Sequence, residues 1–422
     1  MARPLTADIR PDRVPLDVGA YEAAGGYQGL RKALAMNPVQ VQQTVTASGL
    51  KGRGGAGFPT GMKWSFVPMN DRSGHRYLVV NADEKEPGTM KDRWLMEGNP
   101  HQLIEGALIA AWAVQADIAY IFLRREYARC EQSIVQALAE ARQKKYIGPS
   151  VLGSSWNLEF RLHLSAGRYM CGEESGLLNA LEGRRAIPRN KPPFPQVSGL
   201  WGRPTVVNNV ETLCNVPHIL REGPEWYKGL SDSPDSGTKI FGVSGKVKHP
   251  GLWELPMGTT IRELLFECAG GMRDGLALRG FIPGGASTDF LSAEQLDVAL
   301  DFDSVAKAGS RLGTGTMIVL DDHTCPVGMV LALEKFFARE SCGWCTPCRE
   351  GLPWIARTLE ALERGTGESG DLEILESHVQ LLGPGRTFCA LAPGAVESLG
   401  SALRLFRDDF ERHVRQKRCP WK

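Results

Sequence analysis

The chain is organised around one stretch, Gly52-Arg53-Gly54-Gly55-Ala56-Gly57-Phe58-Pro59-Thr60-Gly61-Met62-Lys63-Trp64. Glycine tolerates positive φ and has no Cβ, so the backbone of this stretch can lie close to a ligand. Successive N–H groups can then converge on an anion, and Arg53 and Lys63 add full positive charges. A flexible surface loop is the plainer interpretation of a glycine-rich stretch. The neighbouring rings of Phe58, Trp64 and Phe66 favour a nucleotide or flavin site instead.

The same stretch contains a G-x-G-x-x-G pattern that begins at Gly52. A dinucleotide-binding turn also needs a strand before this pattern and an acidic residue about 20 residues later. Residues 37–50 indicate a short helix that ends at a glycine rather than a strand. The P-loop pattern does not fit either, because Trp64 rather than Ser or Thr follows Lys63. We therefore predict a phosphate or flavin cradle that is not a Rossmann dinucleotide turn.

Length, charge and hydropathy narrow the class of protein. A chain of 422 residues predicts two to four domains. The net charge of +1, from 49 basic and 48 acidic residues, gives no sign of a nucleic-acid or membrane-surface partner. The basic run at residues 412–418 is short, and we expect a solvated tail. No signal peptide is evident, and the most apolar span, residues 103–114, is too short to cross a bilayer. We expect a cytoplasmic protein without membrane insertion, whose ten cysteines serve as thiols or metal ligands.

Strands and helices alternate after the glycine stretch. Residues 77–84 and 118–123 have the continuous apolar character of buried parallel strands, and residues 158–164 alternate as a half-buried strand. Residues 100–115 and 126–146 have helical periodicity. This order predicts an α/β layer with crossover connections.

Polar residues gather where these strands end, the edge at which open α/β sheets bind ligands. The end of the first strand carries Asn81, Asp83, Glu84 and Glu86. Residues 167–174 follow the third strand and lead into a helix at 175–181. Residues 188–209 are rich in Pro, Gly and Asn, and we predict a long binding loop there.

The second half of the chain predicts two further domains after a boundary near residues 231–237. A small α+β domain of the β-grasp kind is indicated by strands at 238–247, 251–255, 278–282 and 317–320 and by a helix at 260–268. A helix bundle is indicated by amphipathic stretches at 329–338, 352–363, 372–382 and 395–416.

Three cysteines in a C-x2-C-x2-C pattern, Cys342, Cys345 and Cys348, give the strongest chemical signal. Such a triplet with one remote cysteine suits a [4Fe–4S] cluster. Cys389, between two predicted helices, is the best candidate for the fourth ligand. Zinc is the less favoured alternative, because zinc sites usually use two separated C-x2-C pairs. The other cysteines are interpreted as ordinary core or surface residues: Cys130, Cys171, Cys214, Cys268, Cys325 and Cys419.

These features together resemble the NADH-binding flavoprotein subunits of respiratory complex I (NADH:quinone oxidoreductase), of the bacterial type. The resemblance spans nearly the whole chain and is carried by residues 52–64, 81–88, 167–176, 208–212 and 340–348. Diaphorase subunits of soluble NAD-linked hydrogenases and formate dehydrogenases share these motifs and are the alternative. Many of those carry an added thioredoxin-like domain, for which the residues before Gly52 leave no room, and this favours complex I.

The resemblance implies the cofactors FMN and a [4Fe–4S] cluster, with NADH as the substrate. It implies a Rossmann-like α/β domain that binds FMN and NADH, with an N-terminal arm, over residues 1–235. A β-grasp (ubiquitin-like) domain would follow over 236–326, and a helix bundle with the cluster over 327–422.

Carried over position by position, the resemblance also implies residue roles. FMN would be held by Gly52, Arg53, Gly54, Gly55, Ala56, Gly57, Lys63, Asn81, Asp83, Glu84, Tyr169, Gly172, Glu173, Lys191, Asn208, Asn209 and Thr212. The adenine of NADH would stack on Phe58, Phe66 and Phe194, rings for which core packing is the plainer interpretation. The catalytic residues Glu86 and Glu174 would orient the ribose and nicotinamide. Cys342, Cys345, Cys348 and Cys389 would ligate the cluster.

The expected reaction is hydride transfer from NADH to FMN, followed by single-electron transfer to the cluster and on towards quinone. No general base is required, because the flavin accepts the hydride directly. The expected partners are a thioredoxin-like [2Fe–2S] subunit and the large Fe–S subunit of the peripheral arm of complex I. The expected location is the cytoplasmic side of the inner membrane. A non-enzymatic alternative is a zinc-stabilised assembly module.

Overall fold

Strand β1 (Tyr77–Ala82) lies inside a parallel sheet whose strands run in the order β3-β2-β1-β4. The structure is a computed structural model that describes residues 2–70 and 73–422. The neighbours of β1 are β2 (Ile118–Leu123) and β4 (Thr205–Asn209), and β3 (Glu159–Leu164) pairs with the far side of β2. Tyr77 to Val80 are all buried, as expected for a strand covered on both faces. The predicted strands at 77–84, 118–123 and 158–164 are confirmed.

Strand β4 corrects the prediction that residues 188–209 form one long loop. Its register places Val206 beside Leu78 and Val207 beside Val79, and both valines are buried. The strand offers only two apolar residues between Thr205 and the asparagines, which is too short a pattern to recognise from sequence. Because β2 and β4 flank β1 on opposite sides, the strand order reverses at β1. The carboxyl ends of β1 and β4 therefore form a topological switch point, where open α/β sheets bind ligands.

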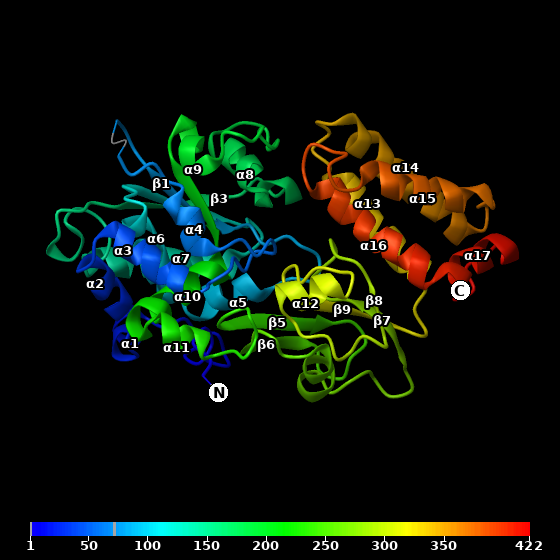
Figure 1. Cartoon of the computed structure of the whole chain (residues 1–422), viewed down its shortest axis with the longest axis horizontal. Coiled ribbons are helices and arrows are strands. Elements are labelled where there is room, and N and C mark those ends of the chain that lie inside the picture. Colours follow the sequence, from blue (N-terminus) through cyan, green and yellow to red (C-terminus); the bar gives the residue numbers. More distant parts are fainter. Residues whose placement is uncertain (1, 71–72) are drawn as a thin grey trace. The chain divides into compact units, whose positions relative to one another are not determined.

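Helices cover both faces of this sheet (Figure 1). They are α1 (Val18–Ala23), α2 (Gln28–Leu34), α3 (Pro38–Ala47), α4 (Thr60–Ser65), α5 (Lys91–Gly98), α6 (Pro100–Ala113), α7 (Ala128–Gln143), α8 (Glu174–Leu181), α9 (Pro195–Ser198), α10 (Val210–Glu222) and α11 (Pro224–Lys228). Helices α6 and α10 contact each other and the sheet. On the other face, Leu177 and Leu178 of α8 share a core with Tyr77, Val79 and Phe122.

The second sheet has the strand order β6-β5-β9-β7-β8. Its strands are β5 (Thr238–Ser244), β6 (Gly251–Pro256), β7 (Leu278–Ile282), β8 (Leu291–Ser292) and β9 (Thr316–Asp321). Strand β9 pairs in parallel with β5 and antiparallel with β7, so the sheet is mixed. This is the predicted β-grasp arrangement. The predicted helix at 260–268 is present, but Glu263–Cys268 is wound as a π-helix.

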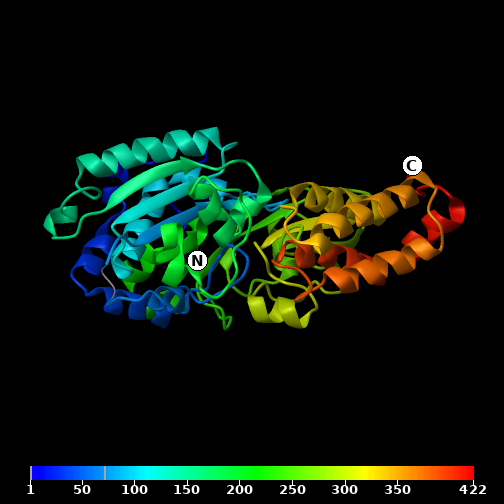
Figure 2. The ribbon, with the colours of Figure 1, turned by 90° about the horizontal axis from the view of Figure 1, so that it is seen from above.

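The C-terminal region is helical, with α13 (Pro326–Glu340), α14 (Thr346–Arg364), α15 (Gly370–Leu382), α16 (Leu391–Leu405) and α17 (Arg407–Gln416) following the short α12 (Phe302–Lys307). Figures 1 and 2 both show α13 to α16 side by side. The predicted helix at 395–416 is two helices, because the backbone leaves the helical region at the buried Phe406. The expected solvated tail at 412–418 is exposed over residues 415–418, but α17 includes residues 412–416 and His413 is buried.

The chain divides into two compact units. Unit 1 comprises Met1–Lys85, Met90–Ile240 and Glu254–Gly258, and unit 2 comprises Glu86–Thr89, Phe241–Trp253 and Thr259–Lys422. The finer boundaries at residues 235/236 and 326/327 stay predictions. Within residues 2–70 and 73–422, no helix has the length and apolar character needed to span a bilayer.

Candidate functional site

The glycine stretch forms a closed loop in unit 1. An isolated antiparallel bridge joins Lys51 to Pro59, and the N–H of Gly52 donates to the carbonyl oxygen of Phe58 at 2.8 Å. Gly55 and Gly57 have φ values of 126° and 67°, which disfavour any residue with a Cβ. The loop leads directly into α4. The positive φ values of Gly55 and Gly57 fold the loop compactly beside the switch point, as the glycine pattern predicted.

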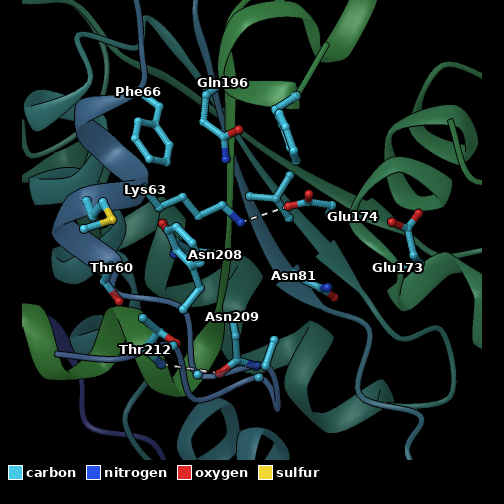
Figure 3. Close-up of a pocket in the computed structure, with 18 of the residues that line it drawn as sticks. Thr60, Lys63, Phe66, Asn81, Glu173, Glu174, Gln196, Asn208, Asn209 and Thr212 are labelled. Carbon is cyan, nitrogen blue, oxygen red and sulfur yellow. Dashed lines mark hydrogen bonds and ion pairs between the residues drawn. The ribbon is translucent and has the colours of Figure 1, made fainter. Parts of the chain in front are cut away.

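A cavity of about 970 Å³ lies beside this loop (Figure 3). Of the predicted site residues, its walls include Gly52, Gly54, Ala56, Gly57, Phe58, Lys63, Phe66, Asn81, Glu173, Glu174, Lys191, Phe194, Asn208, Asn209 and Thr212. Sequence reasoning missed Thr60, Met62, Gln196, Val197 and Val207, which also line it. Thr60 and Met62 belong to the quoted glycine stretch, and Val207 belongs to the unrecognised strand. The cavity therefore collects five segments that are far apart in sequence.

Three asparagines mark the switch point inside the cavity. Asn81 at the end of β1 lies in register with Asn209 at the end of β4. The Asn81 amide donates to the carbonyl oxygen of Gly172 at 2.9 Å. The side-chain oxygen of Asn208 accepts a hydrogen bond from the indole of the buried Trp64 at 2.8 Å. Asn209 caps α10 by accepting from the N–H of Thr212. The strand ends are thus fixed by the surrounding loops before any ligand binds.

Four charged side chains form a compensated group on one wall of the cavity. Lys63 Nζ lies 2.9 Å from Glu174 Oε2, and Lys191 Nζ lies 3.1 Å from Glu174 Oε1 and 2.9 Å from Glu173 Oε1. Figure 3 shows Lys63 and Glu174 pointing toward each other. Burial would raise the pKa of Glu174, but the two lysines outweigh it and lower that pKa. Glu174 is therefore a carboxylate at neutral pH and can accept hydrogen bonds from hydroxyl groups.

Glu173 also holds the start of α8. Its Oε2 accepts from the N–H groups of Ser175 at 2.9 Å and Gly176 at 2.8 Å. This is an N-cap, in which a carboxylate satisfies free N–H groups and complements the helix dipole. The cap leaves the second carboxylate oxygen, Oε1, to position Lys191 at the cavity wall.

Aromatic rings line the mouth of the cavity. Phe58, Phe66 and Phe194 are 46%, 51% and 54% exposed. The rings of Phe58 and Phe66 lie 6.2 Å apart with planes tilted by 54°. Core packing, the plainer interpretation of these rings, is ruled out by their exposure. Large exposed rings around a cavity are suited to stack on a planar ligand.

A buried ion cluster supports the base of the switch point. Lys91 contacts Asp92 at 2.7 Å and Glu211 at 2.8 Å, and Lys239 contacts Glu211 at 3.0 Å. Burial opposes ionisation of Glu211, but the two lysines lower its pKa to about 2. Asp92 also accepts a hydrogen bond from the Asn209 amide at 2.6 Å. The cluster thus ties the cavity residue Asn209 to the interior of unit 1.

Several predicted FMN residues lie outside the cavity lining: Arg53, Gly55, Asp83, Glu84, Tyr169 and Gly172. Asp83 forms a buried ion pair with Lys85. Glu84 accepts from the N–H groups of Asp92 and Arg93 at the start of α5 and from the Tyr127 hydroxyl. In unit 2, Glu86 accepts from the N–H of Ser287 at 2.7 Å. The roles assigned to these residues stay predictions.

Two buried polar groups near the loop lack partners within the described residues. The Thr60 hydroxyl lines the cavity and makes no hydrogen bond. The Arg53 guanidinium donates to Tyr227 and to the Ser236 carbonyl, but its Nε and Nη1 have no partner. Because unsatisfied buried hydroxyl groups are rare in folded proteins, Thr60 in the cavity wall fits a site that receives an acceptor-rich ligand such as a phosphate, whereas Arg53 lies outside the cavity lining.

The four predicted cluster ligands come together in unit 2. Cys342 and Cys345 precede α14, Cys348 lies in its first turn, and Cys389 lies in the loop before α16. Burial raises the pKa of Cys348 to about 12, and the neighbouring Cys345, Cys389 and Cys342 thiols add to the rise. Four such thiols become thiolates only where a cation compensates them, so this donor set fits a metal cluster.

One ring contact between the two cysteine loops, and hydrogen bonds within each loop, hold them in place. The Trp344 and Phe388 rings meet edge to face at 6.5 Å. Arg349 donates to the carbonyl oxygen of Gly343 at 3.0 Å, and the Thr387 hydroxyl donates to that of Cys389 at 2.9 Å. The triplet and the remote cysteine are therefore brought together by side chains next to the ligands.

Known protein families match both the region that contains the cavity and the region that contains the cysteine loops. Residues 45–218 match the family described as Nuo51 FMN-binding domain, and residues 328–413 match the NADH-ubiquinone oxidoreductase-F iron-sulfur binding region. Residues 240–290 match the SLBB domain.

Named relatives cover nearly the whole chain. The F subunit of the NADH-quinone oxidoreductase of Escherichia coli is 55% identical over 98% of this chain and 93% of the relative. An F subunit of the Rhizobium meliloti NADH-quinone oxidoreductase is 49% identical over 96% of each chain. A solved structure of an NAD+-reducing [NiFe]-hydrogenase is 36% identical with a TM-score of 0.79. That match covers 90% of this chain, which spans 63% of the hydrogenase chain. The higher identity and coverage of the quinone oxidoreductase relatives favour them over the diaphorase alternative.

Proposed function

This chain belongs to the family of NADH-quinone oxidoreductase F subunits, the FMN-dependent NADH dehydrogenase subunits with a [4Fe–4S] cluster, and we propose that its cavity in unit 1 is where NADH meets FMN. The observation that carries this proposal is the cavity at the β1/β4 switch point, bordered by the glycine loop, a compensated charge group and exposed rings. It is large enough for a flavin and part of a second nucleotide.

The glycine loop and the strand ends would hold FMN. A Cβ on Gly54 would lie 3.1 Å from Asn209 Cβ, so glycine at this position lets the loop pack closely against the end of β4. The Thr60 hydroxyl and the backbone N–H groups of the loop are suited to phosphate oxygens. Asn81, Asn208 and Thr212 offer polar groups along the same wall. When bound, FMN accepts the hydride of NADH and releases electrons one at a time.

The exposed rings and the charge group would position NADH. Phe58, Phe66 and Phe194 would stack on the adenine, because an adenine ring would cover apolar surface that water now contacts. The Glu174 carboxylate would accept hydrogen bonds from hydroxyl or amide groups of NADH. Lys63 and Lys191 would keep Glu174 ionised and hold it in one orientation. No residue here is assigned a proton-transfer role.

The cysteine set of unit 2 would ligate the [4Fe–4S] cluster through Cys342, Cys345, Cys348 and Cys389. We further propose that this protein joins a thioredoxin-like [2Fe–2S] subunit and the large Fe–S subunit of a complex I peripheral arm. That arm would lie on the cytoplasmic side of the inner membrane and deliver electrons towards quinone. The names of the relatives as subunits of NADH-quinone oxidoreductases support an assembly of this kind.

The function is tested on the full chain purified anaerobically. We expect flavin and iron–sulfur absorbance that bleaches when NADH is added. A colourless protein that contains zinc and ignores NADH would instead identify the zinc-stabilised assembly module.

A substitution at the rim tests the adenine site. Phe194→Ala should raise the KM for NADH about tenfold, because base–aromatic stacking contributes ~1–3 kcal/mol, while FMN content stays unchanged. The matched control is Phe266→Ala, which removes a ring that is 43% exposed in unit 2. An unchanged KM in Phe194→Ala would remove Phe194 from the NADH site.

A further inference from the structure

A second group of metal-type donors lies in unit 2, made of Cys325, Glu363, His413 and Cys419. One ligand atom from each residue lies within 4.8 Å of the other three. Cys325 Sγ lies 3.0 Å from Glu363 Oε1 and 3.4 Å from His413 Nε2, and that Nε2 lies 3.3 Å from Glu363 Oε1. This second donor group shares no residue with the predicted cluster ligands.

The spacing suits one tetrahedral zinc ion. With zinc bonds of about 2.0–2.3 Å, neighbouring ligand atoms lie about 3.3–3.8 Å apart. The distances of 3.3 and 3.4 Å lie in this range and the 3.0 Å distance is just below it, while the Cys419 ligand atom lies within 4.8 Å of the other three. Two thiols, one imidazole and one carboxylate are all ligands that zinc accepts.

The surrounding contacts orient the donors for a metal. His413 Nδ1 lies 2.7 Å from the carbonyl oxygen of Asp409. A proton on Nδ1 satisfies that carbonyl and leaves the Nε2 lone pair facing the group, the arrangement typical of metal-bound histidines. Glu363 is also held by a contact outside the group. Its Oε2 lies 2.5 Å from Lys422 Nζ, which leaves Oε1 facing Cys325.

Cys325 lies at the N-terminus of α13, and burial together with the Glu363 carboxylate raises the pKa of its thiol. It is the N-cap residue of α13, and its Sγ accepts from the N–H of Gly328 at 3.3 Å. The partial positive charge at the helix N-terminus favours a thiolate, but a bound cation would be needed to outweigh burial and the neighbouring carboxylate. The same Sγ therefore has one backbone donor beside it and lies close to the other three donors.

The group is also enclosed. His413 and Cys419 are 1% and 3% exposed, and the Trp421 ring stacks on the His413 ring at 6.0 Å. Burying polar side chains such as these costs free energy unless each one makes a hydrogen bond or binds a metal ion. The four residues come from the start of α13, the end of α14, α17 and the C-terminal segment.

We propose that Cys325, Glu363, His413 and Cys419 bind one structural zinc ion, separate from the iron–sulfur cluster. The ion would fasten the C-terminal segment and α17 to the ends of α13 and α14. Four protein ligands leave no open position, so the role is structural rather than catalytic. A metal-free hydrogen-bonded group and a Cys325–Cys419 disulfide are the alternatives that the experiment must exclude.

The test measures zinc, iron and FMN per chain in the full-length protein, purified anaerobically without chelators or a polyhistidine tag. We expect about one zinc per wild-type chain, as a closed four-ligand site requires. Cys419→Ser and His413→Gln should each lower zinc at least about tenfold, since each removes one of four ligands. Iron and FMN should stay at the wild-type level in both variants. Cys268→Ser is the matched control and should lose neither metal.

A second measurement covers the case in which Cys419→Ser fails to fold. Cobalt(II) added to zinc-depleted wild-type protein should give thiolate-to-cobalt absorbance, which His413→Gln should weaken and shift. Wild-type protein that holds no zinc and takes up neither added zinc nor cobalt would overturn the proposal. A Cys325–Cys419 disulfide found by mass spectrometry in freshly purified protein, or zinc that persists in a Cys325→Ser/Cys419→Ser variant, would also overturn it.

Discussion

The cavity of unit 1 and the cysteine loops of unit 2 are prepared for their cofactors in opposite ways. In the cavity, two lysines (Lys63, Lys191) and two glutamates (Glu173, Glu174) already neutralise one another, and Asn208 and Asn209 already have partners. Around the cysteines, burial and the neighbouring thiols oppose ionisation of Cys348. Protein contacts alone therefore set the geometry of the cavity. The cysteine site differs, because its thiols need a cation before they can ionise and act as ligands.

The largest expected effect tests the dependence of the cysteine loops on metal. Cys389→Ala removes the ligand outside the triplet, and we expect complete loss of the cluster's EPR signal while the FMN absorbance persists. Anaerobic EPR and flavin quantification measure the two outcomes. Cys130→Ala, which removes a buried cysteine in unit 1, is the control. A cluster signal of wild-type intensity in Cys389→Ala would assign the fourth ligand to another residue.

The next effect tests whether the protein itself prepares the cavity. Lys91→Met leaves the carboxylates of Asp92 and Glu211 buried with less compensation. Loss of one partner in a buried ion group costs ~3–5 kcal/mol, so we expect a fall of that size in the free energy of unfolding. Chemical denaturation measures it.

The control for Lys91→Met is Lys228→Met, which removes a more exposed lysine that pairs with Glu225 in the same unit. It should change stability little, because exposed pairs contribute little. Equal effects of the two substitutions would contradict the idea that the ion cluster preorganises the cavity.

The smallest effect concerns pH. Burial, with a contribution from Asp92, raises the pKa of Glu84 from 4.5 to about 7. Between these values the folded state binds more protons than the unfolded state, so stability falls as pH rises from 4.5 to 7. The loss should be about 2–3 kcal/mol and should be absent in Glu84→Gln. Denaturation at about pH 5 and about pH 7.5, on either side of most of this titration, tests the prediction. Parallel losses in both proteins would exclude Glu84 as the source.

Sequence patterns predicted most of the scaffold because its signals are local. The buried strands at 77–84 and 118–123 have continuous apolar runs. The C-x2-C-x2-C triplet is a local pattern typical of iron–sulfur ligands. Strand β4 was missed because Val206 and Val207 alone carry its apolar pattern. Tertiary packing at Phe406 broke a helix whose periodicity continued.

The second donor group shows a different limit. Cys325 and Cys419 were interpreted as scattered cysteines, and His413 as part of a solvated basic tail. Each lies in an unremarkable stretch, and only folding of α14 and α17 against the start of α13 brings them together. Cavity residues such as Gln196 were missed for a similar reason, because short irregular segments give no periodicity that assigns them to a wall.

The register between β1 and β4 also constrains how this chain tolerates insertions. Asn81 lies opposite Asn209, and the side chains of a strand alternate between faces. One residue added within residues 205–209 would turn the asparagine amides to the other face of the sheet. One residue added in the exposed turn at residues 183–185 leaves that register unchanged. Length variation among related chains should therefore gather in the turn and spare the five residues of β4.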